Sequence, residues 1–229
     1  FGNIAHGCSS ILADKLAMNC GDYVVTEAGF GADLGFEKFM DIKVRQGGPE
    51  PSLAVVVTTI RGLKWHGGVA INDMNSTNLE ALRKGSENLK NALRIVNIYG
   101  LPAVVAINRF PTDSKDEIEV VKEVAKSAGA IGVEEANGFV SGGDGMTELA
   151  AAVVEAANQP SEVKLLYEDK DSFFDKVEYL AKSLYLSGNV TWGPMTKTTA
   201  RRFSSNGWDF PVCMAKTHLS ISADPKLKG

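Results

Sequence analysis

Several features that mark particular protein classes are scarce in this sequence of 229 residues. It has only 3 cysteines, widely separated and without a Cys-x-x-Cys pair, which argues against a disulfide framework and a sulfur-ligated zinc site. A reducing, cytoplasmic compartment is therefore expected. Basic charge is not in excess either. The formal net charge of −4 argues against a nucleic-acid-binding protein that relies on a broad basic face.

Long apolar runs and hydrolase motifs are also absent. The longest apolar run, Leu53–Ile60, is too short to cross a bilayer, and no segment has the pattern of a signal peptide. The 3 histidines show no metal-ligand spacing, so no metal site is expected. There is no G-x-S-x-G elbow and no G-x-x-x-x-G-K-[ST] phosphate loop. What remains is the composition of an ordinary soluble protein, 44% hydrophobic and 23% charged.

Short β-branched runs, bounded by turn residues, predict the strands. Two of these runs are apolar on both faces, as strands buried in a parallel sheet are. The predicted strands are 23–26, 53–60, 103–108, 131–133 and, near the end of the chain, 211–214.

Periodic apolar residues predict helices between the strands. Capping-box patterns at Thr77-x-x-Glu80 and Ser114-x-x-Glu117 mark two helix starts. The predicted helices cover about 10–19, 79–96, 118–124, 146–157, 173–184 and 194–206. Strands that alternate with helices in this way predict a doubly wound α/β layer.

A change of pattern at Asn158–Ser161 predicts a division of the chain. Residues 1–160 form the α/β portion that carries the ligand sites. Residues 161–229 form a smaller, helical or α+β portion, because the valine-rich strands stop there.

Four segments follow the strands, where open α/β sheets bind ligands. The first, Thr26–Gly35, resembles a dinucleotide fingerprint with one residue too many. Its glycines Gly29 and Gly31 allow close backbone approach to an anion, and Glu27 and Asp33 are candidates to hold a cation or orient a ligand. A tight turn with a capping Asp33 is the alternative.

The second segment, Arg61–Gly68, combines two cations, Arg61 and Lys64, with a histidine and paired glycines. It suits a phosphate or carboxylate. A solvated basic turn is the alternative.

The other two segments carry aromatic rings. Phe110, held beside Pro111, is a candidate stacking platform for a flat ring, and a core aromatic is the alternative. Phe139, in the glycine-rich stretch 139–145, is a candidate second platform, and a flexible loop is the alternative. The residues alone thus predict a scaffold for an anionic ligand with a flat ring, without naming a reaction.

Several motifs, taken in order, resemble those of formate–tetrahydrofolate ligases. They extend over the whole chain and are far more specific than one glycine signature. They are NIAHGC at 3–8, VVTEAGFGADLGFE at 24–37, TIRGLKWHGG at 59–68, VAINRFPTD at 105–113 and CMAKTHL at 213–219.

The resemblance implies a fold and a reaction. The fold is a P-loop-NTPase-like parallel sheet flanked by helices. The enzyme uses ATP, with Mg²⁺, to activate formate as formyl phosphate, which the N10 amine of tetrahydrofolate attacks to give 10-formyltetrahydrofolate, ADP and phosphate. A monovalent cation and a homotetramer are further implications of the resemblance.

The resemblance also implies roles for particular residues. Phe110, Pro111 and Phe139 correspond to the folate-binding positions, with Phe139 standing where the family has a larger tryptophan. The nucleotide and the intermediate are expected at positions from two segments, which are Gly29, Phe30, Gly31, Asp33, Arg61 and Lys64. Trp65 and Phe36 are lesser departures from the family pattern.

The family's phosphate loop is expected upstream of Phe1, and a short stretch is expected beyond Gly229. The sequence is therefore interpreted as a fragment of a longer ligase, with negligible turnover on its own. Two alternatives stay open. The chain is a non-catalytic module that keeps folate or nucleotide affinity, or it is not a stable fold in isolation.

Overall fold

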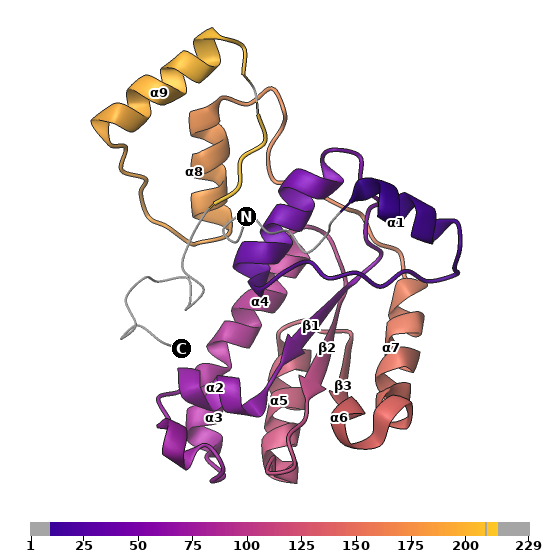
Figure 1. The fold of residues 1–229 in the computed structure, drawn as a ribbon. Coiled ribbons are helices and arrows are strands. Elements are labelled where there is room, and N and C mark those ends of the chain that lie inside the picture. Colours follow the sequence, from indigo (N-terminus) through magenta and orange to yellow (C-terminus); the bar gives the residue numbers. More distant parts are fainter. Residues whose placement is uncertain (1–9, 209, 215–229) are drawn as a thin grey trace. The chain divides into compact units, whose positions relative to one another are not determined.

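The computed structural model describes residues 10–208 and 210–214 (Figure 1). The described residues form two compact units. The sheet unit comprises Pro51–Val163, and the second unit combines the residues up to Glu50 with those from Lys164 onward. The division into 1–160 and 161–229 rests on a change of sequence pattern rather than on contacts, and it stays a prediction.

The sheet unit contains three parallel strands in the order β1-β2-β3. They are β1 (Ala54–Thr58), β2 (Ala103–Asn108) and β3 (Gly132–Ala136). In β2, the central strand, every residue except Asn108 is buried. This explains the continuous apolar run of β2 and confirms the predicted parallel α/β sheet flanked by helices.

Helices cover both faces of the sheet (Figure 1). On one face, α7 (Thr147–Ala157) packs its Leu149 and Ala156 against Val104 and Ala106 of β2. On the other lie α4 (Glu87–Ile98) and α5 (Lys115–Ser127). The remaining elements of the unit are α2 (Ile60–His66), η4 (Ile71–Asp73), α3 (Leu79–Gly85), α6 (Gly138–Ser141) and η5 (Gly142–Met146).

Local capping signals were partly correct. The Ser114–Glu117 capping box opens α5 as predicted. The cap predicted at Thr77 is wrong, because Asn78 is the N-cap of α3 and its Oδ1 accepts a hydrogen bond from the Ala81 N–H at 3.0 Å. The single helix predicted over 79–96 is two helices, α3 and α4. They meet at Ser86, whose hydroxyl donates to the Leu82 carbonyl.

The basic loop predicted at 61–68 is instead helix α2. Thr59 caps it, accepting from the Gly62 N–H at 3.0 Å. A Cβ at Gly67 or Gly85 would collide with the backbone of the facing helix. Gly67, one of the paired glycines that suggested a ligand loop, and Gly85 of α3 therefore allow α2 and α3 to pack closely.

The regular elements of the second unit's described residues are helices. It contains α1 (Ile11–Met18), α8 (Phe173–Ser183) and α9 (Pro194–Ser205), which confirms three predicted helices. Along the chain, α1 is followed by a helical segment with two π-helical stretches, η2 (Gly31–Phe36) and η3 (Phe39–Val44).

Two strand predictions in this unit are wrong. Residues 23–26 are irregular, with Val25 89% exposed and Tyr23 also exposed. Residues 211–214 are irregular too, and their backbone groups form hydrogen bonds with side chains rather than with a neighbouring strand. The Val212 N–H and carbonyl both bond the Tyr167 hydroxyl, at 2.8 and 2.9 Å. A β-branched run forms a strand only where another strand accepts its hydrogen bonds.

None of the helices within residues 10–208 and 210–214 has the length and apolar character that a membrane span requires.

Candidate ligand site at the carboxyl edge of the sheet

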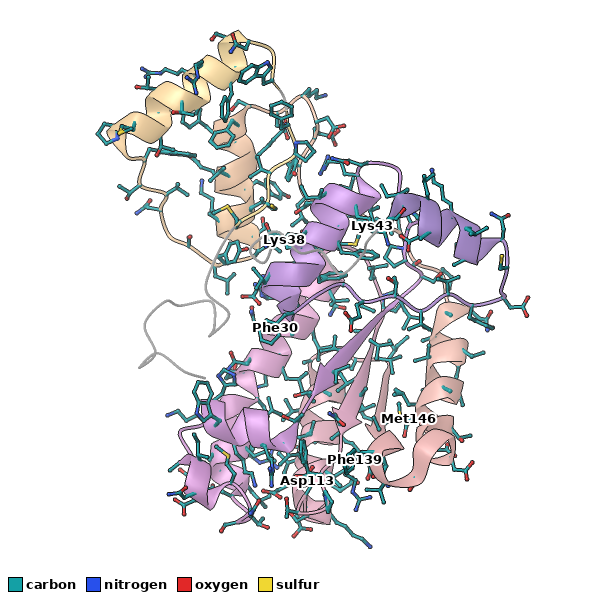
Figure 2. The ribbon with its side chains drawn as sticks, viewed as in Figure 1. Phe30, Lys38, Lys43, Asp113, Phe139 and Met146 are labelled. Atoms are coloured by element: carbon teal, nitrogen blue, oxygen red, sulfur yellow. The ribbon has the colours of Figure 1, made fainter. Side chains whose placement is uncertain are left out.

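The ends of three neighbouring strands bring three predicted site residues to one edge of the sheet unit. Arg61 follows β1, Phe110 follows β2 and Phe139 follows β3. The strands are parallel, and Asn108 at the end of β2 is in register with Ala136 at the end of β3. The segments carrying Phe110 and Phe139 therefore leave the sheet side by side. Figure 2 shows Phe139 and Asp113 at this end of the sheet.

The backbone around Phe110 is fixed by the buried side chain of Asp113. Its Oδ2 accepts a hydrogen bond from the Phe110 N–H at 2.8 Å, and the Asp113 N–H donates to the Phe110 carbonyl at 3.0 Å. Burial raises the pKa of Asp113, and the Phe110 N–H opposes this rise. Phe110 is partly buried and Pro111 is exposed. The loop is thus a rigid support for the aromatic ring.

Arg61 lies against that ring. Its guanidinium carbon is over the ring of Phe110, 4.7 Å from the centroid. Its Nη2 donates to Asn75 Oδ1 at 2.5 Å and to Thr112 Oγ1 at 3.4 Å. The Nε atom is buried without a hydrogen-bond acceptor in the described part of the chain.

Lys64, predicted to contact the nucleotide or intermediate, is fully buried in an ion pair. Its ammonium lies 2.8 Å from Glu117 Oε1 and donates to the Ser76 carbonyl at 3.0 Å. Burial alone would raise the pKa of Glu117, but hydrogen bonds from Lys64 and Ser114 outweigh it and hold the pKa below its usual value. The pair joins α2 to α5, and a direct contact of Lys64 with a ligand would require the pair to open.

Phe139 lies on the short helix α6 and is 93% exposed. The stretch around it is compact, because the Asn137 N–H donates to the Gly145 carbonyl at 3.0 Å. Gly142 has φ +58° and ψ −139°, a conformation open only to glycine, and it ends the helix. The predicted loop is therefore an ordered turn that presents a large aromatic side chain to solvent.

The glycine-rich turn at 26–35 belongs to the second unit. Gly29 and Gly31 have φ values of +81° and +75°. A Cβ at Gly35 would overlap the backbone of Ala28 and Gly29, so the start of η2 packs directly on the turn. Phe30 is 68% exposed. Asp33 lies in the first turn of η2 but does not cap it, because the N-cap is Phe30 and no side chain makes a cap hydrogen bond, so the alternative of a capping Asp33 is wrong.

Comparison with known proteins identifies the family. The family model described as formate–tetrahydrofolate ligase matches residues 1–229. The chain belongs to the formate–tetrahydrofolate ligase family.

The similar curated proteins carry the same name. Formate–tetrahydrofolate ligase of Desulforamulus reducens is 46% identical over 238 aligned residues, covering all of this chain and 42% of that protein. The enzymes of Symbiobacterium thermophilum and a Sphingobium species are 47% and 48% identical, again covering the whole chain and 41% of each protein. The chain thus spans about two fifths of the length of these relatives.

The second unit of this ligase-family chain holds buried polar groups that were not predicted from sequence. Glu37 is fully buried. Its Oε2 accepts from the Tyr185 hydroxyl at 2.6 Å, and its Oε1 accepts from the Met214 N–H at 2.9 Å. Burial raises the pKa of Glu37 to about 6, although both hydrogen bonds lower it. Burial of the phenol, and then the Glu37 carboxyl group, in turn raise the pKa of Tyr185.

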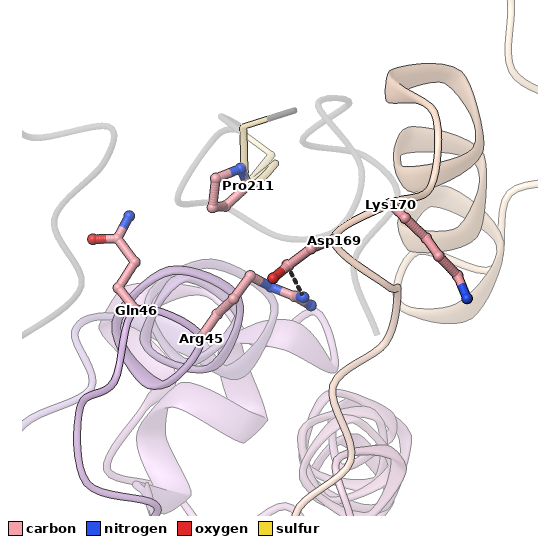
Figure 3. A pocket seen from close by; sticks show the side chains of 5 residues that line it. All are labelled: Arg45, Gln46, Asp169, Lys170 and Pro211. Carbon is pink, nitrogen blue, oxygen red and sulfur yellow. Dashed lines mark hydrogen bonds and ion pairs between the residues drawn. The ribbon is translucent and has the colours of Figure 1, made fainter. Parts of the chain in front are cut away.

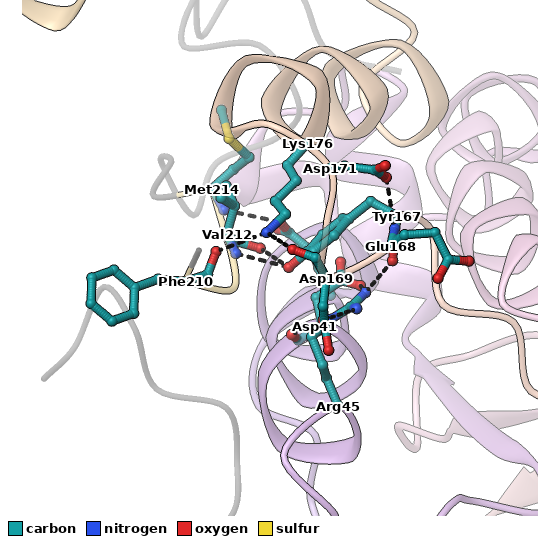
Figure 4. A network of polar contacts seen from close by, with 11 residues as sticks. Asp41, Arg45, Tyr167, Glu168, Asp169, Asp171, Lys176, Phe210, Val212 and Met214 are labelled. Carbon is teal, nitrogen blue, oxygen red and sulfur yellow. Dashed lines mark hydrogen bonds and ion pairs between the residues drawn. The ribbon is translucent and has the colours of Figure 1, made fainter. Parts of the chain in front are cut away.

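A second polar cluster connects three distant segments of this unit (Figure 4). Lys176 donates to the carbonyls of Asp169 and Phe210, at 2.7 and 3.4 Å. Arg45 donates to the Tyr167 carbonyl at 2.8 Å and pairs with Asp169 at 2.7 Å. Sequence patterns do not reveal most of these contacts, since Arg45 lies more than 120 residues from Tyr167 and Asp169, and Lys176 lies 34 residues from Phe210. A charged residue within an apolar helical stretch is the only sequence clue.

Open pockets within residues 10–208 and 210–214 include two that lie outside the aromatic edge. One, of about 410 Å³, is lined by Arg45, Gln46, Asp169, Lys170 and Pro211 (Figure 3). The ion pair between Arg45 and Asp169 already engages its two central charges. The other, of about 350 Å³, lies beside α2 and α3 and is lined by Gly67, Gly68, Val69, Ala70, Asp73, Asn78 and Ala81.

Proposed function

We propose that this chain is part of an ATP-dependent ligase that joins formate to tetrahydrofolate through formyl phosphate. The products are 10-formyltetrahydrofolate, ADP and phosphate. The proposal carries over to this chain the activity named for its relatives. The observation that supports it most directly is the pair of phenylalanines at adjacent strand ends. Phe110 is held in a rigid loop after β2. Phe139 is exposed and follows β3, whose last residue is in register with the last residue of β2.

The aromatic edge is proposed as the folate site. A flat pterin ring can stack on the face of a phenylalanine, as aromatic pairs do in offset arrangements. Phe110, Pro111 and Phe139 form the proposed platform. The smaller ring of Phe139, compared with tryptophan, reduces the stacked area and removes an N–H donor.

Gly29, Phe30, Gly31 and Asp33 of the glycine-rich turn are proposed as one contact for the nucleotide or the intermediate. Arg61 and Lys64 of α2, in the sheet unit, are proposed as a separate contact, and no joint site is assigned to the two. The turn supports the first contact because Gly29 and Gly31, which have positive φ values, are exposed and present backbone without side chains. The chemical task of these residues is to position two anions and to offset their charge in the transition state.

Magnesium, a monovalent cation and a homotetramer complete the proposal. The described residues contain no group of three or more His, Cys, Asp or Glu that could hold a metal ion. They do not fit a resident metal centre, so no step is assigned to one. Mg²⁺ that enters with ATP is typically bound largely by the phosphates.

The folate assignment is tested by calorimetry of the chain with tetrahydrofolate. Phe110→Ala is expected to weaken binding by roughly 1–3 kcal/mol, the range of an aromatic stacking contact. Phe173→Ala, in the aromatic cluster of the second unit, is the matched control and is expected to leave the affinity unchanged. Unchanged affinity in Phe110→Ala would show that the stacking assignment is wrong.

The reaction is tested separately with a longer protein that contains this chain, supplied with formate, ATP and tetrahydrofolate. Formation of 10-formyltetrahydrofolate is expected there, and negligible turnover is expected from the 229 residues alone. No product from the longer protein would refute the ligase reaction.

A non-catalytic folate-binding or nucleotide-binding module is the second candidate. The closed ion pair of Lys64 with Glu117 favours it, because one of the two cations proposed for chemistry is engaged in holding α2 on α5. Tetrahydrofolate binding by the longer protein without any product would support this second candidate.

A further inference from the structure

Arg61 contacts the proposed platform from a fixed position. Its guanidinium carbon lies over one face of the Phe110 ring, 4.7 Å from the centroid. The guanidinium is itself anchored, because its Nη2 donates to Asn75 at 2.5 Å and more weakly to Thr112 at 3.4 Å. One face of the ring is therefore covered by a cation that is held from two further segments.

Asp113 fixes the same residue from the backbone side. Its carboxylate accepts from the Phe110 N–H, and its own N–H returns a bond to the Phe110 carbonyl. Asp113 thus sets the backbone of Phe110, while Arg61 is placed to set the orientation of the ring. The two contacts are independent, since they act on different atoms of Phe110.

We propose that Arg61 is a positioning residue for the flat ring of the ligand. It holds the Phe110 ring in one orientation and covers one of its faces, so that the ligand stacks on the opposite face. A ring fixed before binding loses less freedom when the ligand arrives, and a cation on one face fits the negative potential of the ring. The proposal rests on the proposed folate site, and it is separate from the phosphate contact predicted for Arg61.

Affinities for two ligands distinguish this role from a phosphate contact. With ATP absent, Arg61→Gln and Arg61→Lys are both expected to raise the Kd for tetrahydrofolate by roughly 3- to 30-fold, the range of a cation–π contact, whatever either variant does to the Kd for ATP. Arg83→Gln is the matched control, because Arg83 forms an exposed ion pair with Glu123 in the same unit. A rise in the Kd for ATP that lysine restores, with tetrahydrofolate binding unchanged, would overturn the proposal.

A double-mutant cycle tests whether Arg61 acts through Phe110. In a Phe110→Ala background, Arg61→Gln is expected to add no further loss of tetrahydrofolate affinity, because the ring that it holds is gone. Additive losses would overturn the proposal, since Arg61 would then contact the ligand by itself. Tighter binding in Arg61→Gln alone would also overturn it, because the guanidinium would then occupy the ligand's face.

A measurement without ligand keeps the proposal separate from the folate assignment. With 4-fluorophenylalanine at position 110, the fluorine resonance is expected to be narrow in the otherwise unchanged chain and to shift and broaden in Arg61→Gln. An unaltered line would overturn the positioning role. If the unaltered chain does not bind tetrahydrofolate, the proposed folate site is wrong, and so is the claim that the ligand stacks on the opposite face of Phe110. The fluorine resonance still decides whether Arg61 orients the ring.

Discussion

The two units of this chain are stabilised by different interactions. In the sheet unit, an apolar strand is sandwiched between helices, and residues such as Val105 and Ile107 are fully buried. In the second unit, helices and irregular segments are joined by buried polar groups such as Glu37 and Lys176. Apolar burial tolerates small displacements, whereas a buried polar group depends on a partner at one position. The second unit should therefore respond more to pH.

The largest expected effect is a loss of stability in the sheet unit, where one buried ion pair is an exception to the apolar packing. Lys64→Met leaves the carboxylate of Glu117 buried without its cation, which costs about 3–5 kcal/mol of stability. Chemical denaturation of the unit, followed by Trp65 fluorescence in a Trp192→Phe, Trp208→Phe background, measures the loss.

The matched control for this substitution is Lys90→Met, which breaks an exposed pair with Glu87. A loss below about 1 kcal/mol is expected there. Equal losses in the two variants would mean that burial does not distinguish the pairs.

The next effect is a dependence of the second unit on pH. The pKa of Glu37 is raised from 4.5 to about 6 in the folded state, so the folded state binds the proton more tightly than the unfolded one. The resulting stability is fully present below pH 4.5 and is lost as pH rises through 6. The loss is about 2 kcal/mol, from a difference of about 1.5 pKa units.

Unfolding of this unit is followed by Trp192 and Trp208 in a Trp65→Phe background. Glu37→Gln is expected to remove the fall in stability between pH 4.5 and 6. Glu178→Gln, on the exposed face of α8, should retain it. A fall that persists unchanged in Glu37→Gln would assign the pH dependence to another group.

The smallest effect concerns a local interaction. Ser114→Ala removes the hydroxyl that accepts from the Glu117 N–H at the start of α5, and about 1 kcal/mol of stability is expected to be lost. Ser114→Thr, which keeps the cap, is the control. A loss as large as that of Lys64→Met would mean that the whole polar cluster around Glu117 had rearranged.

The elements that were predicted correctly depend on neighbours in sequence. The apolar run of β2 and the Ser114–Glu117 cap are both readable within a few residues. Helix α2 was predicted as a loop, because its glycines are typical of turns and their contact with α3 is visible only after folding. The run at 23–26 has strand-forming residues but no strand beside it in the described structure.

The candidate site divides in the same way. The sequence was sufficient to place Arg61, Phe110 and Phe139 after successive strands, since strand order and parallel pairing bring those positions to one edge. It did not reveal that Lys64 is paired with Glu117, or that the guanidinium of Arg61 lies on Phe110.

By itself, the sequence determined the family, the parallel sheet and the edge at which ligands are proposed to bind, because periodicity, caps and ordered motifs are local properties of the chain. Only the tertiary structure decided which charges are buried and what they contact. Glu37 lies 148 residues from Tyr185 and 177 from Met214 along the chain. Such contacts depend on distances in space that no local pattern records, and the burial that accompanies them raises the pKa of Glu37.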